Sequence, residues 1–365
     1  MKAKSVIKVD EEVAEAAVLG GAFFGGGGGG DLRLGLRHAK LAVQLGEVLI
    51  VDVGSIPEDK FVVTASMVGA PAAKEKYLVP AHALRSTELF IDVGQLPLGG
   101  IISSENGGYS TINGWIQSAL LGIPIVDAPA DGRAHPTGVM GAIGLHKIPD
   151  YISIQTAVGG SKELGRYVEV IAKGSLEKTA KIIREAAVQA GGLVAVTRNP
   201  VTPEYLKKNA AVGGITQAIE VGRIIRAHKN DPEQMIKKII EHLGGGELID
   251  RGEVEKVLLE TRGGFDIGKV IVKSRDTRYE LIFWNEFMSL EDSDGNRYGT
   301  FPDLIVAIDI DNSLPLTSAE IRRGNKVALV VIPKKKLILG AGVKDPDVLK
   351  TVEQVVGGQN DEAGY

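Results

Sequence analysis

The sequence contains no cysteine, which excludes several kinds of protein at once. A chain without thiols has no disulfide scaffold, no thiolate nucleophile and no sulfur-ligated metal, and it suits a reducing compartment. Long apolar runs are missing too, since none approaches the ~20 residues of a membrane-spanning helix. The N-terminal segment 1–17 meets charged residues after only a few apolar ones, so it lacks a signal-peptide core. We therefore expect a cytoplasmic protein that does not contact a membrane.

The sequence also lacks any block of charge of one sign. Its 42 basic and 46 acidic residues are well mixed and leave a formal charge of -4. Because the sequence has no basic stripe, nucleic acid is not an expected partner. Small molecules or other proteins are the expected partners. The length of 365 residues favours two domains, and 44% hydrophobic residues are enough for packed cores.

The first half of the chain alternates helical and strand patterns. Asp10 is placed to cap a helix that continues to residue 24. Asp31 is placed to cap a second helix, which ends at Gly46. Further helices are expected over 81–93 and 111–122, and buried strands over 47–53, 60–68, 99–105 and 123–128. Strands that alternate with helices predict an α/β N-terminal domain with a mostly parallel sheet, over residues 1–165.

The second half is different in character. Strands are expected over 151–160 and 166–174, followed by helices over 175–192, 214–230 and 231–246. From Glu247 onward, short apolar runs separated by turns indicate strands. The sequence thus predicts a mixed, mostly β C-terminal domain over residues 166–365.

Six consecutive glycines, Gly25 to Gly30, join the first two helices. A flexible linker is a poor explanation because the run lies inside one predicted domain. A dinucleotide fingerprint would follow a strand, and no Gly-Lys-Ser or Gly-Lys-Thr completes a phosphate loop. Two explanations stay open. The glycines form a nest of amide groups that binds an anion or a polarised carbonyl, or they only permit close packing of the turn.

Two loops place ionisable residues at the ends of buried strands. Glu105 follows the strand at 99–105 beside Gly107 and Gly108, where a carboxylate can act as general acid or base or simply accept bonds from the turn. The next strand leads into the segment that holds Asp127, Asp131, Arg133 and His135. An Asp/Arg pair there is either a structural ion pair or part of a site.

These three stretches together resemble the S-methyl thiohydantoin desulfurase (S-Me-THD) family, also known as DUF917, whose genes lie near those of hydantoinases and oxoprolinases. The matching residues are Gly25 to Gly30, Glu105, Gly107, Gly108, Asp127, Gly132, Arg133, Ala134 and Pro136. The segment 302–333 is similar to the end of the family's second half. The chain departs from the pattern at Pro129, Ser110 and His135, where relatives carry an aspartate, an asparagine and an apolar or aromatic residue.

The resemblance implies two domains and a hydrolytic enzyme that acts on a small cyclic amide or thiohydantoin-like ring. Glu105 or Asp127 would activate water, and Arg133 with the glycine amides would stabilise charge on the ring. The residues expected to contact the substrate are Gly27, Gly28, Gly29, Gly30, Asp31, Gly107, Gly108, Ser110, Asp131 and His135. The alternative is a non-catalytic ligand-binding or regulatory partner of a hydantoinase- or oxoprolinase-like enzyme.

Two further expectations concern cofactors and assembly. No cofactor is predicted, and a metal is not favoured because neither H-x-H nor H-E-x-x-H spacing occurs. The segment 279–290 carries Phe283, Trp284 and Phe287, which either fill the second core or meet another subunit. Together with possible free sheet edges, this segment leads us to expect a homo-oligomer.

Overall fold

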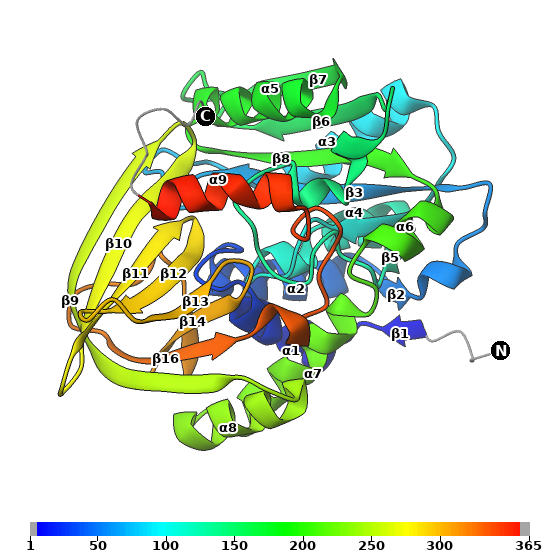
Figure 1. The fold of residues 1–365 in the computed structure, drawn as a ribbon. Helices are drawn as coiled ribbons and strands as arrows, with labels where there is room; N and C mark the ends of the chain where they lie inside the picture. Colours follow the sequence, from blue (N-terminus) through cyan, green and yellow to red (C-terminus); the bar gives the residue numbers. More distant parts are fainter. Residues whose placement is uncertain (1–5, 358–365) are drawn as a thin grey trace.

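A computed structural model describes residues 6–357 and arranges them around two eight-stranded sheets (Figure 1). The first five and last eight residues of the two expected domains lie outside this range. Strands of the first sheet follow the order β1-β2-β5-β4-β3-β8-β6-β7. Their bounds are β1 (Val6–Lys8), β2 (Leu49–Val51), β3 (Phe61–Gly69), β4 (Leu98–Ser103), β5 (Ile125–Val126), β6 (Ser153–Gly159), β7 (Val168–Gly174) and β8 (Leu193–Val201).

The first sheet is mixed. Its neighbours β2, β5, β4 and β3 pair in parallel, and these are the strands expected in the first half of the chain. The remaining pairs are antiparallel: β1 with β2 at one end of the sheet, and β3 with β8, β8 with β6 and β6 with β7 at the other. The predicted α/β half with its parallel strands is therefore confirmed. Strands β7 and β8 also belong to this sheet although they follow residue 166, the expected start of the second domain.

The second sheet has the order β13-β12-β11-β10-β9-β16-β14-β15, and each adjacent pair is antiparallel. Its strands are β9 (Glu247–Arg262), β10 (Phe265–Lys273), β11 (Arg278–Trp284), β12 (Glu286–Asp292), β13 (Arg297–Thr300), β14 (Leu304–Asp309), β15 (Leu314–Leu316) and β16 (Lys326–Ile332). This sheet confirms the mostly β second half.

The helices are α1 (Glu11–Phe24), α2 (Leu32–Leu45), α3 (Pro80–Gly94), α4 (Trp115–Leu121), α5 (Leu176–Gln189), α6 (Pro203–Asn209), α7 (Gly214–Ala227), α8 (Pro232–Leu243) and α9 (Pro346–Val356). Asp10, Asp31 and Asp231 accept backbone hydrogen bonds at the starts of α1, α2 and α8, as their positions predict. Each described helix is too short or too polar to cross a membrane.

Helices α1 and α7 hold the two sheets together. Gly20 of α1 lies so close to Ala218 of α7 that a side chain there would meet its carbonyl oxygen at 1.7 Å. Apolar residues of both helices share one continuous core with Ile101 of the first sheet and Val330 of the second. Because this core is continuous, the two sheets are fixed relative to each other.

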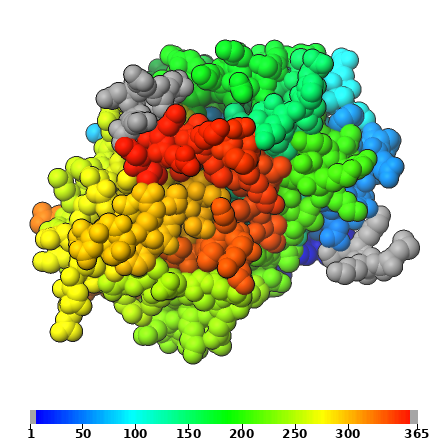
Figure 2. All heavy atoms as spheres, viewed as in Figure 1, coloured from blue at the N-terminus to red at the C-terminus, as the bar shows by residue number. Residues whose placement is uncertain are grey.

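Helix α9 also bridges the two halves. It crosses the face seen in Figures 1 and 2, between strands of the second sheet and the N-terminal half. Its Val352 and Val355 pack in one cluster with Met140 and with Trp284 of β11. Trp284, Phe283 and Phe287 are all buried within the chain, so these aromatic side chains fill core space.

Candidate active site between the two halves

A cavity of about 490 Å³ lies between residues of both halves of the chain. The first half lines it with the end of the glycine loop, the turn after β4, the loop at 135–138, and residues of α5 and β8. The second half contributes Asn285, Glu286 and residues near Thr317. A cavity of this size suits a small ligand.

The glycine loop runs between groups from both halves. On one side Gly28 faces Glu286, and a Cβ on this glycine would lie 1.9 Å from Glu286 Oε1. On the other side Gly29, with φ of 73°, would place a Cβ 2.4 Å from Gly107 Cα. The Gly29 carbonyl accepts hydrogen bonds from the amides of Tyr109 and Ser110. Close packing therefore requires glycine at both positions.

The amides of Gly29 and Gly30 remain available on the cavity wall. Both residues line the cavity, and neither amide makes a hydrogen bond with any residue of the described range. Gly28, in contrast, donates its amide to Gly25 O at 2.9 Å. The loop therefore packs tightly, as one of the two explanations for its sequence predicts, and two of its amides have no acceptor among the described residues.

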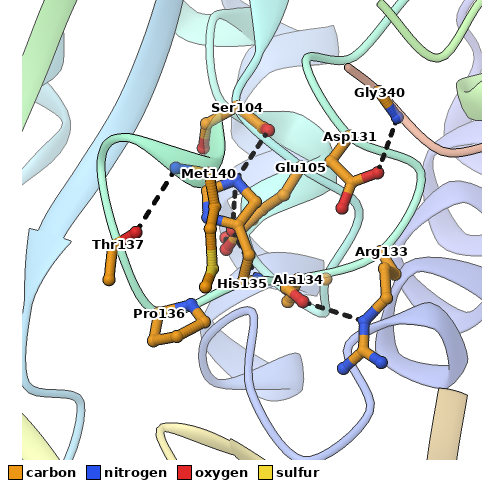
Figure 3. A network of polar contacts seen from close by, with 12 residues as sticks. Ser104, Glu105, Asp131, Arg133, Ala134, His135, Pro136, Thr137, Met140 and Gly340 are labelled. Carbon is orange, nitrogen blue, oxygen red and sulfur yellow. Dashed lines mark hydrogen bonds and ion pairs between the residues drawn. The ribbon is translucent and has the colours of Figure 1, made fainter. Parts of the chain in front are cut away.

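Glu105 is held in the cavity wall by two hydrogen bonds and by a contact with the His135 ring. Its Oε1 accepts from the Ser110 hydroxyl at 2.8 Å, and its Oε2 accepts from the His135 amide at 3.1 Å. The His135 ring nitrogen Nε2 is 3.3 Å from the same Oε2 and 3.3 Å from Ser104 O. Figure 3 shows His135 and Glu105 lying against each other. Three residues of the predicted site, Glu105, Ser110 and His135, therefore form one hydrogen-bonded group.

The protonation of His135 follows from its neighbours. Both groups near Nε2 are acceptors, so Nε2 carries the hydrogen and Nδ1 does not. Burial lowers the pKa of His135, and the charge of Glu105 opposes this shift only in part. Because the pKa is lowered, the ring is neutral near pH 7. The neutral His135 ring therefore lies against the Glu105 side chain without forming an ion pair with it, and the His135 amide orients the Glu105 carboxyl group.

The second carboxyl group of the cavity, Glu286 at the start of β12, was not predicted. Its side chain is buried and lines the cavity, and Oε2 has no hydrogen-bond partner within residues 6–357. Burial raises the pKa of Glu286 well above its usual value, and the negative charge of Glu105 adds to this shift. The only signal in the sequence is the polar pair Asn285-Glu286 inside a run of aromatic and apolar residues.

Two arginines of the cavity wall, the half-buried Arg184 and the buried Arg198, were also not predicted. Arg184 comes from α5 and Arg198 from β8, and burial lowers the pKa of each guanidinium to about 10. Both stay charged near neutral pH. The sequence signal was weak, since Arg198 lies within a mostly apolar strand that the pattern did not single out, and Arg184 lies in an ordinary amphipathic helix.

Asp127 lies at the start of α7 and does not line the cavity. Its Oδ1 accepts from the amides of Ile215 and Thr216, at 2.8 and 3.2 Å, and its Oδ2 accepts from the Thr216 hydroxyl at 2.5 Å. Burial raises the pKa of this carboxyl, and the hydrogen bonds oppose that shift. This arrangement resembles a helix cap more than a catalytic base.

Asp131 is completely buried and also lies outside the cavity lining. Its Oδ1 accepts from the amides of Gly132 and Gly340, at 2.9 and 3.0 Å, and thereby ties the loop to the segment after β16. Its Oδ2 has no partner among the described residues. Burial raises the pKa of Asp131 to about 8.

Arg133 is fully buried, and Figure 3 shows its guanidinium pointing away from Glu105 and His135. Nε donates to Ala134 O at 3.0 Å, and Nη1 donates to Pro302 O at 3.3 Å and Asp303 O at 2.5 Å. The guanidinium also lies 4.4 Å from the centroid of the Phe301 ring. Arg133 thus connects the loop to the second half of the chain and does not line the cavity.

The structure therefore divides the predicted site residues into two sets. Those that line the cavity are Glu105, Gly29, Gly30, Asp31, Ser110 and His135. Those that support its walls without lining it are Asp127, Arg133, Gly27, Gly28, Gly107, Gly108 and Asp131. Within residues 6–357, no three histidine, aspartate or glutamate side chains form a group that could hold a metal ion.

Comparisons with known proteins identify a family. The S-Me-THD-like N-terminal domain matches residues 13–162, and the S-Me-THD-like C-terminal domain matches residues 175–341. A crystal structure of a protein from Chromobacterium violaceum is similar in fold, with a TM-score of 0.72 at 20% identity over 98% of both chains. No curated protein matches the chain. The chain belongs to the S-Me-THD-like family.

Proposed function

We propose that this protein is a hydrolytic enzyme that acts on a small cyclic amide or thiohydantoin-like ring bound in the cavity. The observation that carries the proposal is the pair of buried carboxyl groups on the cavity wall. Glu105 accepts two hydrogen bonds and lies 3.3 Å from His135 Nε2, whereas the buried Glu286 is favoured in its protonated form. A carboxyl group that accepts from its surroundings and a second one that holds a proton are suited to a general base and a general acid.

In a desulfurase reaction, the attacking water would lose a proton to Glu105 while its oxygen bonds to the ring carbon that carries the methylthio group. The negative charge that develops on the ring nitrogen would be stabilised by the free amides of Gly29 and Gly30. The carbon–sulfur bond then breaks, and the leaving thiolate takes the proton of Glu286 and departs as methanethiol. Exchange of protons with solvent restores Glu105 and Glu286 for the next cycle.

The supporting groups have definite tasks in this scheme. Ser110 and His135 orient the Glu105 carboxylate, and Gly28 leaves space for Glu286. Arg133 acts indirectly in this proposal, because it ties the loop before His135 to the second half. A hydantoinase- or oxoprolinase-like protein and further copies of this chain remain predicted partners.

The test is methanethiol release from 2-methylthio-substituted imidazolones, together with ring opening of a panel of hydantoins. Glu105→Gln should lower kcat at least about a hundredfold, because the amide cannot take the proton of water. Asp127→Asn is the matched control, since it alters a carboxyl group outside the cavity lining and should keep most of the activity. If no ring in the panel is hydrolysed and E105Q changes only the affinity for a ring, the chain is a binding protein.

A further inference from the structure

Arg198 carries a buried guanidinium that has no hydrogen-bond partner. Its side chain is on the wall of the cavity and the residue is 3% exposed. Its Nε is buried and has no hydrogen-bond partner among residues 6–357. Such a group loses its hydration without replacement, which costs about 1–3 kcal/mol or more for a charged donor. The unused donors therefore point to a ligand that supplies acceptors.

The position of Arg198 brings these donors close to the proposed reaction centre. Arg198 lies within β8, where it pairs with Gln155 of β6. Its Nη1 would be 3.0 Å from a Cβ on Gly138, in the loop that carries His135. The positive charge of Arg198 also helps to lower the pKa of His135, after burial as the main cause. A group bound by Arg198 would therefore lie near the Glu105–His135 pair.

Arg184 adds a second positive charge that is fixed in place. Its Nη1 donates to Gly69 O at 3.1 Å and Gly264 O at 2.9 Å, and its Nη2 donates to Pro136 O at 3.1 Å. The guanidinium lies 4.0 Å from the Phe265 centroid. All these acceptors are neutral, so the charge of Arg184 is not balanced by an ion pair.

The carboxyl groups of the cavity do not balance the two arginines. Of the described residues, none forms an ion pair within 4.0 Å with Arg184 or Arg198, and the Glu105 carboxyl group lies against the neutral His135 ring instead. Glu286 is favoured in its protonated form. With Glu286 protonated, the cavity is lined by four cationic side chains, Lys76, Arg184, Arg198 and Arg322, against three carboxylates, Asp31, Glu105 and Glu320, and this balance favours an anion.

We propose that Arg198, with the charge of Arg184 beside it, forms a carboxylate-binding subsite, so that the substrate carries an anionic group on a side chain of its ring. This inference rests on the proposed function and specifies its substrate class. A guanidinium presents two parallel N–H donors that match the two oxygens of a carboxylate, whereas a neutral carboxamide offers one acceptor. The subsite would select rings derived from acidic precursors over neutral ones.

The first experiment measures binding by calorimetry with two probes, hydantoin-5-acetic acid and hydantoin-5-acetamide. The wild-type protein should bind the acid at least tenfold more tightly than the amide. Arg198→Gln should abolish this preference and leave the affinity for the amide within about threefold. If R198Q does not fold, Arg198→Lys replaces it and should reduce the preference at least threefold, because an ammonium lacks the planar fork.

Arg322→Gln is the matched control. Arg322 also lines the cavity, but its side chain is exposed and Nη1 donates to Ile321 O at 2.8 Å. R322Q removes the same charge and should retain the preference for the acid. A wild-type protein that binds both probes equally, or an R198Q variant that keeps the preference, overturns the subsite.

Turnover separates this proposal from the proposed function. The 2-methylthio derivatives of the two rings are compared for methanethiol release, with the binding data alongside. Equal turnover of both rings would refute the carboxylate subsite and leave the hydrolase standing. Selective binding of the acid without turnover of either ring would support the subsite and count against the hydrolase.

Discussion

Arg133 allows a sharp test of how this loop contributes to stability. Replacing Arg133 with lysine keeps the charge but removes the planar set of donors that reaches Ala134 O, Pro302 O and Asp303 O. It also removes the stacking on Phe301. A lysine ammonium at the end of a flexible chain can satisfy only part of these acceptors.

The expected loss follows from these contacts. Hydrogen bonds to a charged group contribute about 1.5–3 kcal/mol each, and a desolvated cation–π contact contributes about 1–2 kcal/mol. If lysine keeps one of three hydrogen bonds, the free energy of unfolding falls by about 4–5 kcal/mol after allowance for non-additivity. A chain of this length has an unfolding entropy of roughly 0.8 kcal/mol/K, so Tm should fall by about 5–6 °C.

The assay is thermal unfolding of R133K beside Arg33→Lys, which changes an exposed arginine on α2. R33K should shift Tm by less than about 1 °C, as surface substitutions usually do. Ring binding by R133K is measured below its Tm. Unchanged stability together with a tenfold loss of binding would refute this reasoning and show that Arg133 holds the ligand directly.

Four other predictions follow from the same contacts. Gly28→Ala should destabilise the fold and lower activity, because the new Cβ would lie 1.9 Å from Glu286 Oε1. Gly54→Ala is the control in the same melting and turnover assays, because a Cβ on Gly54 would meet no atom within 4 Å. Burial raises the pKa of Asp131 to about 8 in the folded state. Between about pH 4 and 8 the folded protein therefore holds a proton on Asp131 that the unfolded chain has lost. The free energy of unfolding should fall as the pH rises through this range, by up to ~1.4 kcal/mol per pH unit. Urea unfolding at several pH values should show a shallower fall for Asp131→Asn, and an identical slope would contradict this assignment. Asp127→Ala should lower stability by about 1–2 kcal/mol through the loss of the α7 cap while turnover persists, and complete loss of turnover at retained stability would reinstate Asp127 as a catalytic group. Light scattering at micromolar concentration should give the mass of a homo-oligomer, and the mass of a single chain would end that expectation.

Local patterns were sufficient to predict the helices and most strands that frame the site. Asp10 and Asp31 begin α1 and α2 because a side-chain oxygen before an apolar stripe satisfies free amides at a helix start. The elements missed include β1, β8, α6 and α9. Strand β8 carries few turn signals and follows directly after α5, and α9 is a short amphipathic segment near the end of the chain.

The site was predictable only where its residues lie close together in sequence. Glu105, Ser110 and His135 belong to loops at the ends of neighbouring strands, where ligands collect in α/β sheets. Glu286 lies 181 residues after Glu105, so its place beside the first half depends on how the two sheets pack, which no local pattern reveals. Arg133 illustrates the same limit, because Gly132 and Pro136 indicate an irregular loop but not that its arginine turns toward Phe301.

The packing around the glycine run explains why so much bare backbone is needed there. The loop hydrogen-bonds to the second half, since Gly26 O accepts from the Phe287 amide and Gly27 O accepts from the Ser318 amide, each at 2.7 Å. On its other side, Gly29 O accepts from the turn after β4. A loop held by both sheets within hydrogen-bond distance has no room for side chains on either side. The same backbone therefore lies between Glu105 on one half and Glu286 on the other, and a side chain introduced along it would push these two carboxyl groups apart.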